Sequence, residues 1–221
     1  QRQMCIRDRN EPCTTAAIRL IELANKKMSG SVYLADVTDA FSVERLNKEF
    51  FNGYKAQYKK FSDTLSDTKQ HRDYVKKLLG RLVFLQFLQK KGWMGVPASN
   101  IKWEGGDKNY LSNLINQYPN NDKLLSNVLN PLFFNTLNEK RNGDIADNIL
   151  GGNIKIPYLN GGLFDKDRID ELDIDFPYSY FKDLMEFFSQ YNFTIDENDP
   201  DDSEVGICLL YTSDAADEAR S

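Results

Sequence analysis

Residues 70–91 of this 221-residue chain read QHRDYVKKLLGRLVFLQFLQKK. Apolar side chains recur in this stretch at three- and four-residue spacing on two adjacent faces, which is the period of an α-helix. Few polar positions interrupt its second half, so other parts of the chain are expected to cover both faces. The pattern predicts a central core helix that ends at Gly92, because glycine is favoured just after a helix. The predicted core positions are Tyr74, Val75, Leu78, Leu79, Leu82, Val83, Leu85 and Phe87.

The segments on either side carry further helical periodicity. A long amphipathic helix is predicted from Ser42 to about Leu65, and shorter helices over residues 14–27, 109–118, 122–137 and 178–191. Pro131 is expected to kink or restart the helix over residues 122–137. Residues 31–37 and 193–195 are typical of short strands, and residues 143–162 of loops. The predicted fold class is mainly α, an irregular multi-helix domain with long loops and at most a few short strands. The predicted apolar face of the long helix is Val43, Leu46, Phe50, Phe51, Tyr54, Tyr58 and Phe61.

Composition narrows the class of protein. The chain has 28 Lys+Arg against 33 Asp+Glu, and 41% of its residues are hydrophobic, which is enough for a packed core. No apolar run approaches the roughly 20 residues of a membrane span, and the N-terminus lacks the apolar segment of a signal peptide. Cys13 is the only cysteine in residues 10–207, so a disulfide or multi-cysteine metal site is excluded there. We therefore predict a cytoplasmic protein with no membrane partner.

The two ends of the sequence are related at the DNA level. One back-translation of residues 208–218, read on the opposite strand in a shifted frame, encodes residues 1–8. This inverted repeat resembles a transposase adapter used in preparing sequencing libraries. Residues 1–9 and 208–221 are therefore predicted to be adapter-derived artefacts, which are excluded from fold reasoning. Residues 10–207 would then be the interior of a longer, metagenomic gene product.

Charge is distributed unevenly along the chain. Residues 44–91 contain 12 basic and 5 acidic residues, and residues 164–207 contain 3 basic and 14 acidic residues. The basic stretch is consistent with a nucleic-acid face, or with a solvated or salt-bridged surface of a larger protein. The acidic stretch is interpreted as a solvated surface whose partners lie elsewhere in the parent protein.

Motifs that carry chemistry are few. His71 is the only histidine, so a histidine-based catalytic or zinc site would need residues outside this chain. The carboxylates between residues 170 and 175 lack calcium-loop spacing and are interpreted as solvated. No phosphate-binding Gly-x-x-x-x-Gly-Lys-Ser/Thr loop occurs, and the Gly-Gly pairs at 105, 151 and 161 are interpreted as turns. The residues alone therefore predict no catalytic or metal site.

Five segments together carry a family resemblance. They are residues 41–51 (FSVERLNKEFF), 80–94 (GRLVFLQFLQKKGWM), 128–137 (VLNPLFFNTL), 156–164 (IPYLNGGLF) and 191–197 (YNFTIDE). In this order they resemble the helical region just upstream of the methyltransferase domain in large adenine-specific DNA methylases. That group includes the type IIG fused restriction–modification enzymes and related phage-defence methylases. Residues 10–40 match no segment of this group and stay an uncertain N-terminal segment.

The resemblance implies a bacterial or archaeal parent enzyme that uses S-adenosylmethionine to methylate adenine in DNA after flipping the base out of the stack. It implies a methyltransferase domain after residue 207 as a partner, and many such enzymes also carry a nuclease domain before the helical region. Residues 41–207, which we call the connector, would link these domains without binding the cofactor or catalysing the reaction.

Two sets of connector residues are candidate functional residues. Lys76, Lys77 and Arg81 are candidates for contact with the DNA backbone, because lysine and arginine neutralise phosphates. Asn160, Gly161 and Gly162 form a motif loop that either supports the methylase pocket or makes a type I′ turn, since Asn-Gly favours positive φ. Two alternative interpretations of the chain remain: it is a non-catalytic helical scaffold of an unrelated protein, or it is part of a dedicated nuclease.

Overall fold

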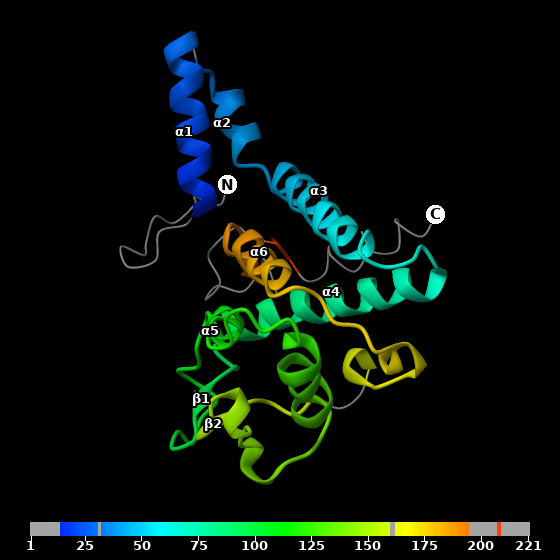
Figure 1. Ribbon diagram of the computed structural model, residues 1–221. Coiled ribbons are helices and arrows are strands. Elements are labelled where there is room, and N and C mark those ends of the chain that lie inside the picture. Colours follow the sequence, from blue (N-terminus) through cyan, green and yellow to red (C-terminus); the bar gives the residue numbers. More distant parts are fainter. Residues whose placement is uncertain (1–13, 31, 160–161, 195–206, 209–221) are drawn as a thin grey trace. The chain divides into compact units, whose positions relative to one another are not determined.

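The computed structural model describes residues 14–30, 32–159, 162–194 and 207–208 (Figure 1). The fold is mainly α, as the sequence predicts, and no helix in these ranges is long and apolar enough to cross a membrane. The chain divides into two compact units, residues 1–56 with 186–221 (unit 1) and residues 57–185 (unit 2). The limits predicted for the connector, residues 41 and 207, differ from this division and stay predictions.

The core of unit 2 is built on helix α4 (Lys69–Lys90), which confirms the predicted central helix. The Thr68 hydroxyl caps its first turn by accepting a hydrogen bond of 3.2 Å from the backbone N–H of His71. Gly92 follows its last residues at φ 71°, a left-handed conformation that glycine adopts without strain. All eight predicted core positions are buried, and none is more than 7% exposed. The periodicity of residues 70–91 therefore locates the core of this unit.

Short elements complete unit 2 around α4. Strands β1 (Val96–Pro97) and β2 (Ile154–Lys155) pair antiparallel, with Val96 opposite Lys155. Helices α3 (Val43–Ser62) and α6 (Tyr178–Ser189) begin or end in this unit, where Phe61 packs edge-on against Phe176 and Phe181. The remaining helical elements are α5 (Tyr110–Asn116), η1 (Leu125–Leu129), η2 (Pro131–Leu137), η3 (Asn142–Asp144), η4 (Asn148–Leu150), η5 (Gly162–Phe164) and η6 (Arg168–Glu171).

The helix predicted over residues 122–137 is present, but its hydrogen bonding is π-helical over most of its length. Two π-helical segments, η1 and η2, lie on either side of Asn130, which is itself helical at φ −63° and ψ −43°. Pro131 is the first residue of η2, as the predicted restart requires, because proline has no backbone N–H to donate to the preceding turn. The backbone nevertheless stays helical through this point. The buried side chains Leu125, Val128 and Leu132 form one apolar face across both segments.

Unit 1 contains helices α1 (Thr14–Ser29) and α2 (Leu34–Ala40) and the parallel strand pair β3 (Phe193–Thr194) and β4 (Ile207–Cys208). Phe50 on α3 forms its aromatic centre, with ring centroids 5.5 Å from Phe187 and 5.8 Å from Phe193. The prediction that Phe51 also faces inward is wrong, because its side chain is 38% exposed. Adjacent residues on an α-helix point about 100° apart, so Phe50 and Phe51 do not share one narrow face.

The strand predicted over residues 31–37 is also wrong where the structure describes this stretch, because helix α2 begins at Leu34. The Asp36 carboxylate accepts a hydrogen bond of 2.8 Å from the backbone N–H of Tyr33, and the Thr38 hydroxyl donates one of 3.0 Å to the Leu34 carbonyl. Both are local bonds that an isolated strand could not make. Val32 and Tyr33, the β-prone residues of this stretch, precede the helix, and Tyr33 is extended at φ −101° and ψ 161°.

Replacing a core residue of α4 tests this arrangement. We expect Leu82→Ala to lower the free energy of unfolding by about 2–5 kcal/mol, because its fully buried side chain would leave a cavity. Chemical denaturation followed by circular dichroism measures the change. The matched control is Ile101→Ala at a 98% exposed side chain, which should change stability by no more than about 0.5 kcal/mol. Equal effects of the two substitutions would contradict the assigned core.

Candidate functional site

The candidate site is a group of paired charges between α4 and η6, formed by Lys77 and Arg81 on α4 and by Asp167 and Asp170 at η6, which we call the Arg81 cluster. Lys77 and Arg81 are four residues apart on α4 and therefore share one helix face. Arg81 donates two hydrogen bonds to the Asp170 carboxylate, one of 2.6 Å from Nη1 to Oδ1 and one of 2.9 Å from Nη2 to Oδ2. Both side chains are 3% exposed. This is a buried, bidentate ion pair, the strongest geometry that arginine makes with a carboxylate.

Arg81 and Lys77 each make further hydrogen bonds or ion pairs with residues 163–170. Arg81 Nε donates a bond of 2.8 Å to the carbonyl of Leu163, and Nη2 one of 3.3 Å to that of Asp165. Lys77 Nζ lies 2.7 Å from Asp170 Oδ2 and 2.8 Å from Asp167 Oδ2. The two cations therefore hold residues 163–170 against α4 through both side-chain and backbone acceptors.

The electrostatics of the cluster favour full ionisation. Burial opposes the charge on Asp170, but hydrogen bonds from Arg81 and Lys77 outweigh it and lower its pKa to about 2. The hydrogen bond from Lys77 likewise lowers the pKa of Asp167. The Arg81 guanidinium also lies 4.9 Å from the ring centroid of Phe134, which is cation–π distance. Two positive and two negative charges leave the cluster neutral.

This chemistry is structural rather than catalytic. A carboxylate with a pKa of about 2 is a weak base near neutral pH. Asp170 already accepts bonds from Arg81, Lys77 and the backbone N–H of Asp167, which leaves little capacity for a substrate. The arrangement anchors a loop to the core helix.

The three predicted DNA-contact residues differ in their exposure to solvent. Lys76 is exposed on α4, Lys77 is partly buried in the Arg81 cluster, and Arg81 is 2% exposed. Gly162 has φ 74°, and its N–H donates a bond of 2.9 Å to Asp165 Oδ2. The other two residues of the motif loop, Asn160 and Gly161, lie outside the described residues.

The interpretation of the carboxylates between residues 170 and 175 as a solvated stretch is wrong for two of them. Asp170 is buried in the Arg81 cluster. Asp175 accepts hydrogen bonds of 3.0 Å and 2.5 Å from the backbone N–H and hydroxyl of Ser126, at the start of η1. Their partners are distant in the sequence, so local spacing does not reveal them.

One local signal was available in the sequence around Asp170. Asp167 and Asp170 are three residues apart, the spacing of reciprocal helix capping. Asp167 Oδ1 accepts a bond of 2.9 Å from the backbone N–H of Ile169, and Asp170 Oδ2 accepts one of 3.2 Å from that of Asp167. This spacing predicts a short ordered helical turn, which the structure shows as η6.

Arg141 is a second cation whose guanidinium donates its hydrogen bonds to backbone carbonyl groups. Arg141 donates bonds of 2.6 Å to the carbonyl of Ile145, 2.7 Å to that of Ile156 and 3.1 Å to that of Thr136. Burial lowers its pKa, although nearby carboxylates oppose this effect. These bonds close the loop over residues 136–156 and satisfy carbonyls that no helix or strand engages.

His71 and the acidic residues provide no metal centre in the part of the chain that the structure describes. His71 Nδ1 lies 2.8 Å from the Ser66 carbonyl oxygen, which can only accept, so this nitrogen carries the proton. Among the described residues, no three His, Cys, Asp or Glu side chains are grouped to hold a metal ion.

Comparison with known proteins identifies a relative of part of this chain. The chain is 32% identical over 123 residues to a protein of Methanocaldococcus jannaschii whose name describes a type II restriction enzyme and methyltransferase. The match spans 53% of this chain but 10% of that protein. The chain thus spans about a tenth of the length of the relative it matches. No family model and no solved structure matches the sequence. The similarity supports a restriction–modification relationship.

Removing the carboxylate of the Arg81 cluster tests its anchoring role. We expect Asp170→Asn to lower the free energy of unfolding at pH 7 by about 3 kcal/mol, because the Arg81 guanidinium stays buried without its counter-charge. Urea denaturation of both proteins measures the difference. Asp173→Asn, at an exposed position in the same segment, is the matched control and should leave stability nearly unchanged.

The pH dependence of that difference has a defined sign. The pKa of Asp170 is lowered to about 2 in the folded chain, against about 3.9 when unfolded. Its ionisation therefore stabilises the fold fully above about pH 4 and progressively less as the pH falls toward 2. The difference between wild type and Asp170→Asn should shrink as the pH is lowered from 5 to 3. A difference that stays constant over this range would show that Asp170 is not ionised in the cluster.

Proposed function

We propose that residues 41–207 are a non-catalytic helical connector of a larger restriction–modification enzyme. The observation that carries this proposal is the 123-residue similarity to the Methanocaldococcus jannaschii protein. The five segments that resemble the region upstream of adenine-specific methyltransferase domains support the finer assignment. In this proposal S-adenosylmethionine and the target adenine bind to a following methyltransferase domain, and DNA is the partner of the whole enzyme.

The chemistry of the described residues supports a connecting rather than a catalytic role. The buried charges Arg81 and Asp170 are paired with each other, and Arg141 is satisfied by carbonyl groups. Such groups stabilise a fold but have no free capacity for proton transfer or cofactor binding. Paired buried charges of this kind stabilise unit 2, and a stable folded segment is suited to lie between two neighbouring domains.

Contact with the DNA backbone is a separate part of the proposal, and Lys76 is its best-placed residue. Lys76 is exposed, whereas Lys77 and Arg81 already contact carboxylates. A phosphate would have to displace Asp170 to reach Arg81, which would leave a buried charge uncompensated. We therefore assign direct phosphate contact to Lys76 and a positioning role to the other two.

The natural gene around this segment tests the connector proposal. We expect the reading frame after codon 207 to continue into a Gly-rich cofactor loop and an Asn-Pro-Pro-Tyr or Asn-Pro-Pro-Phe motif. Sequencing the source DNA on both sides measures this directly. In parallel, the purified 221-residue chain should neither bind S-adenosylmethionine in calorimetry nor transfer its methyl group to DNA.

Three outcomes would contradict the connector proposal. Methylation of DNA by the 221-residue chain alone would show that it is catalytic. An unrelated continuation after codon 207 would favour the helical scaffold. An upstream Asp…Glu-x-Lys metal site without a methylase downstream would favour the nuclease.

The DNA contact is tested by the salt dependence of binding. We expect Lys76→Ala to reduce the slope of log affinity against log salt by about one, because one phosphate contact is lost. Fluorescence anisotropy with a duplex of fixed sequence measures the slope. Lys123→Ala, at another exposed lysine of unit 2, is the matched control and should leave it unchanged. Equal slopes for wild type and Lys76→Ala would rule out the contact.

A further inference from the structure

Three lysine and arginine residues are buried among the described residues, and two of them have an opposite charge beside them. Arg19 pairs with Glu49, and Arg81 pairs with Asp170. The third is Lys155, which is 8% exposed and forms no ion pair with a carboxylate of the described residues. Taking a charge out of water is costly unless an opposite charge replaces the water. Lys155 is therefore a buried cation that lacks a counter-charge within this part of the chain.

The contacts of Lys155 leave part of its ammonium group unused. Lys155 lies on β2, and its Nζ donates a hydrogen bond of 2.6 Å to the carbonyl oxygen of Asn100. The same nitrogen lies 4.9 Å from the ring centroid of Trp103, which is cation–π distance. An ammonium group has three N–H donors. One carbonyl and one aromatic ring therefore leave a donor for a further acceptor, and an anion is the acceptor that binds an ammonium group most strongly.

Arg141 shows what a cation has around it when backbone carbonyls are its partners. Its guanidinium donates hydrogen bonds to three carbonyl oxygens, and the nearby carboxylates of Asp144, Asp147 and Glu139 favour its charge. Lys155 donates to one carbonyl oxygen. The charge of Arg141 is therefore balanced within this chain, whereas that of Lys155 is not.

The loop that joins β1 to α5 contains both partners of Lys155, but other bonds hold this loop in place. The backbone N–H of Ala98 donates a bond of 2.8 Å to the carbonyl of Asn153. At the other end, the backbone N–H of Gly106 donates one of 3.1 Å to the carbonyl of Gly92. Because these backbone bonds close the loop, a neutral side chain at residue 155 would be sufficient for folding.

The acidic residues of this loop do not neutralise Lys155. The Glu104 carboxylate lies 3.8 Å from Nζ of Lys102, and both side chains are largely exposed. The Asp107 carboxylate accepts a bond of 2.7 Å from the side-chain amide of Asn113. The missing negative charge therefore has to come from outside the loop.

Trp103 gives the site a second feature. Its ring is partly exposed beside the Lys155 ammonium. Proteins contact nucleic acids with cations that bind the phosphates and with aromatic rings that stack on the nucleotides. A cation without a counter-charge next to a partly exposed tryptophan fits this pattern.

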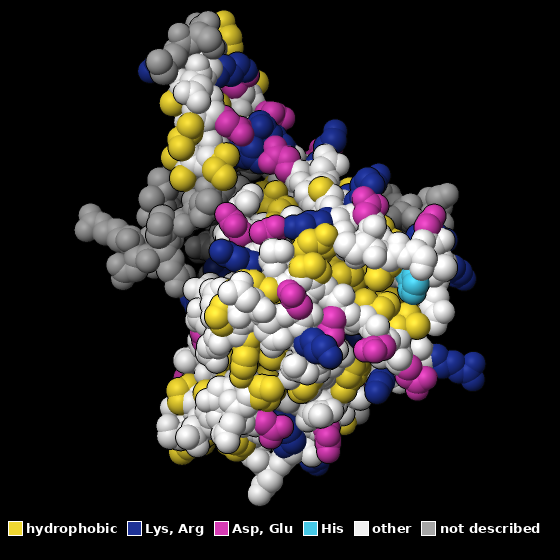
Figure 2. Space-filling model, viewed as in Figure 1, with side chains coloured by type: hydrophobic (Ala, Val, Ile, Leu, Met, Phe, Trp, Pro, Cys, Tyr) yellow, Lys and Arg dark blue, Asp and Glu magenta, His cyan; other side chains and the backbone are white. Residues whose placement is uncertain are grey.

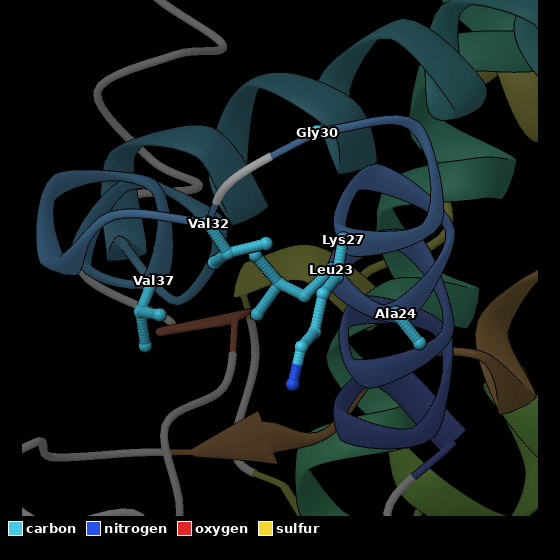
Figure 3. A pocket seen from close by; sticks show the side chains of 6 residues that line it. All are labelled: Leu23, Ala24, Lys27, Gly30, Val32 and Val37. Atoms are coloured by element: carbon cyan, nitrogen blue, oxygen red, sulfur yellow. The ribbon is translucent and has the colours of Figure 1, made fainter.

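The groove between α1 and α2 in unit 1 gives no comparable signal. Figure 3 shows Leu23 extending from α1 toward Val32, with the Lys27 side chain beside it. Lys27 is exposed, so water solvates its charge, and Lys26 is paired with Asp36. On the face that Figure 2 shows, basic and acidic side chains are likewise interspersed. Exposed charges of this kind need no outside partner.

We propose that Lys155 and Trp103 form a binding site for a phosphate group of the DNA backbone. The phosphate accepts a hydrogen bond from Nζ of Lys155 and supplies the missing negative charge, and the exposed part of the Trp103 ring contacts the adjoining nucleotide. The need for an anion follows from the contacts of Lys155, whereas DNA as its source rests on the proposed function. This site is additional to the contact assigned to Lys76.

The affinity of the 221-residue chain for a DNA duplex tests the site. Lys155→Met keeps the length of the side chain but removes its charge, and should lower the affinity about fivefold to tenfold near 0.1 M salt. It should also reduce the slope of log affinity against log salt by about one. Lys155→Arg keeps the charge and should retain most of the affinity. Lys123→Met, at an exposed lysine of unit 2, is the matched control and should change the affinity much less.

Thermal unfolding of the same variants separates binding from a purely structural role. Lys155→Met removes a buried charge that has no counter-charge, so the midpoint of unfolding should not fall. A lower midpoint with unchanged DNA affinity would show that Lys155 only supports the loop, and it would overturn the proposal. The proposal also fails if the wild-type chain does not bind the duplex. Neither result bears on the connector proposal, which the sequence after codon 207 tests separately.

Tryptophan fluorescence identifies the source of the phosphate. Trp93→Phe leaves Trp103 as the only tryptophan of the chain, and the duplex should quench its emission in this variant. Adding Lys155→Met should weaken the quenching. Inorganic phosphate at the same total phosphate concentration should have little effect. An equal response to inorganic phosphate would show a general anion site and contradict the assignment to DNA.

Discussion

The buried ion pair between Arg81 and Asp170 is the constraint on which unit 2 depends. Helix α4 is buried on nearly every face, so a guanidinium at residue 81 has to be met by an opposite charge inside the protein. Burying one charge without its partner is far more costly than burying the pair. Asp170 provides the counter-charge, and the carbonyl of Leu163 takes a further donor. Correct placement of residues 163–170 is therefore a condition for burying α4, and the loop and the core helix fold together.

This coupling changes how the charge distribution of the chain is interpreted. The basic stretch over residues 44–91 and the acidic stretch over residues 164–207 look like surfaces for separate partners. Within unit 2 they partly neutralise each other, because Lys77 and Arg81 pair with Asp170 and Lys60 pairs with Asp183. Local net charge in a sequence therefore overstates the charge available to DNA, since pairing inside the fold has to be subtracted first.

Sequence reasoning succeeded where the determining forces are local and failed where they are not. The core face of α4 follows from a repeating apolar pattern, and the start of the second helical segment η2 at Pro131 follows from the missing N–H of proline. The Arg81–Asp170 pair joins residues 89 positions apart, and no local pattern reports such a contact. The strand pattern of residues 31–37 does not predict helix α2, because the β-prone Val32 and Tyr33 lie just before the helix. The seven residues of α2 are stabilised by hydrogen bonds from Tyr33 to Asp36 and from Thr38 to Leu34. For the candidate site, the sequence predicted the cations Lys77 and Arg81 but not their pairing with the carboxylates of Asp167 and Asp170.

The two units differ in which side chains they bury and which charges they pair. In unit 2 large apolar side chains are buried around α4 and the buried charges of Arg81 and Asp170 are paired. In unit 1 ion pairs from Arg19 hold α1, and apolar side chains such as Ile21 and Leu34 stay exposed. Exposed apolar area is what a protein loses most favourably on association. The charged groups of α1 and α2 are paired within the chain, as Lys26 is with Asp36 and Asp39 with Arg45, so the two helices leave apolar rather than charged groups exposed to solvent. In unit 2 the reverse holds, because its large apolar side chains are buried and the buried charges of Arg81 and Asp170 meet each other in the same core.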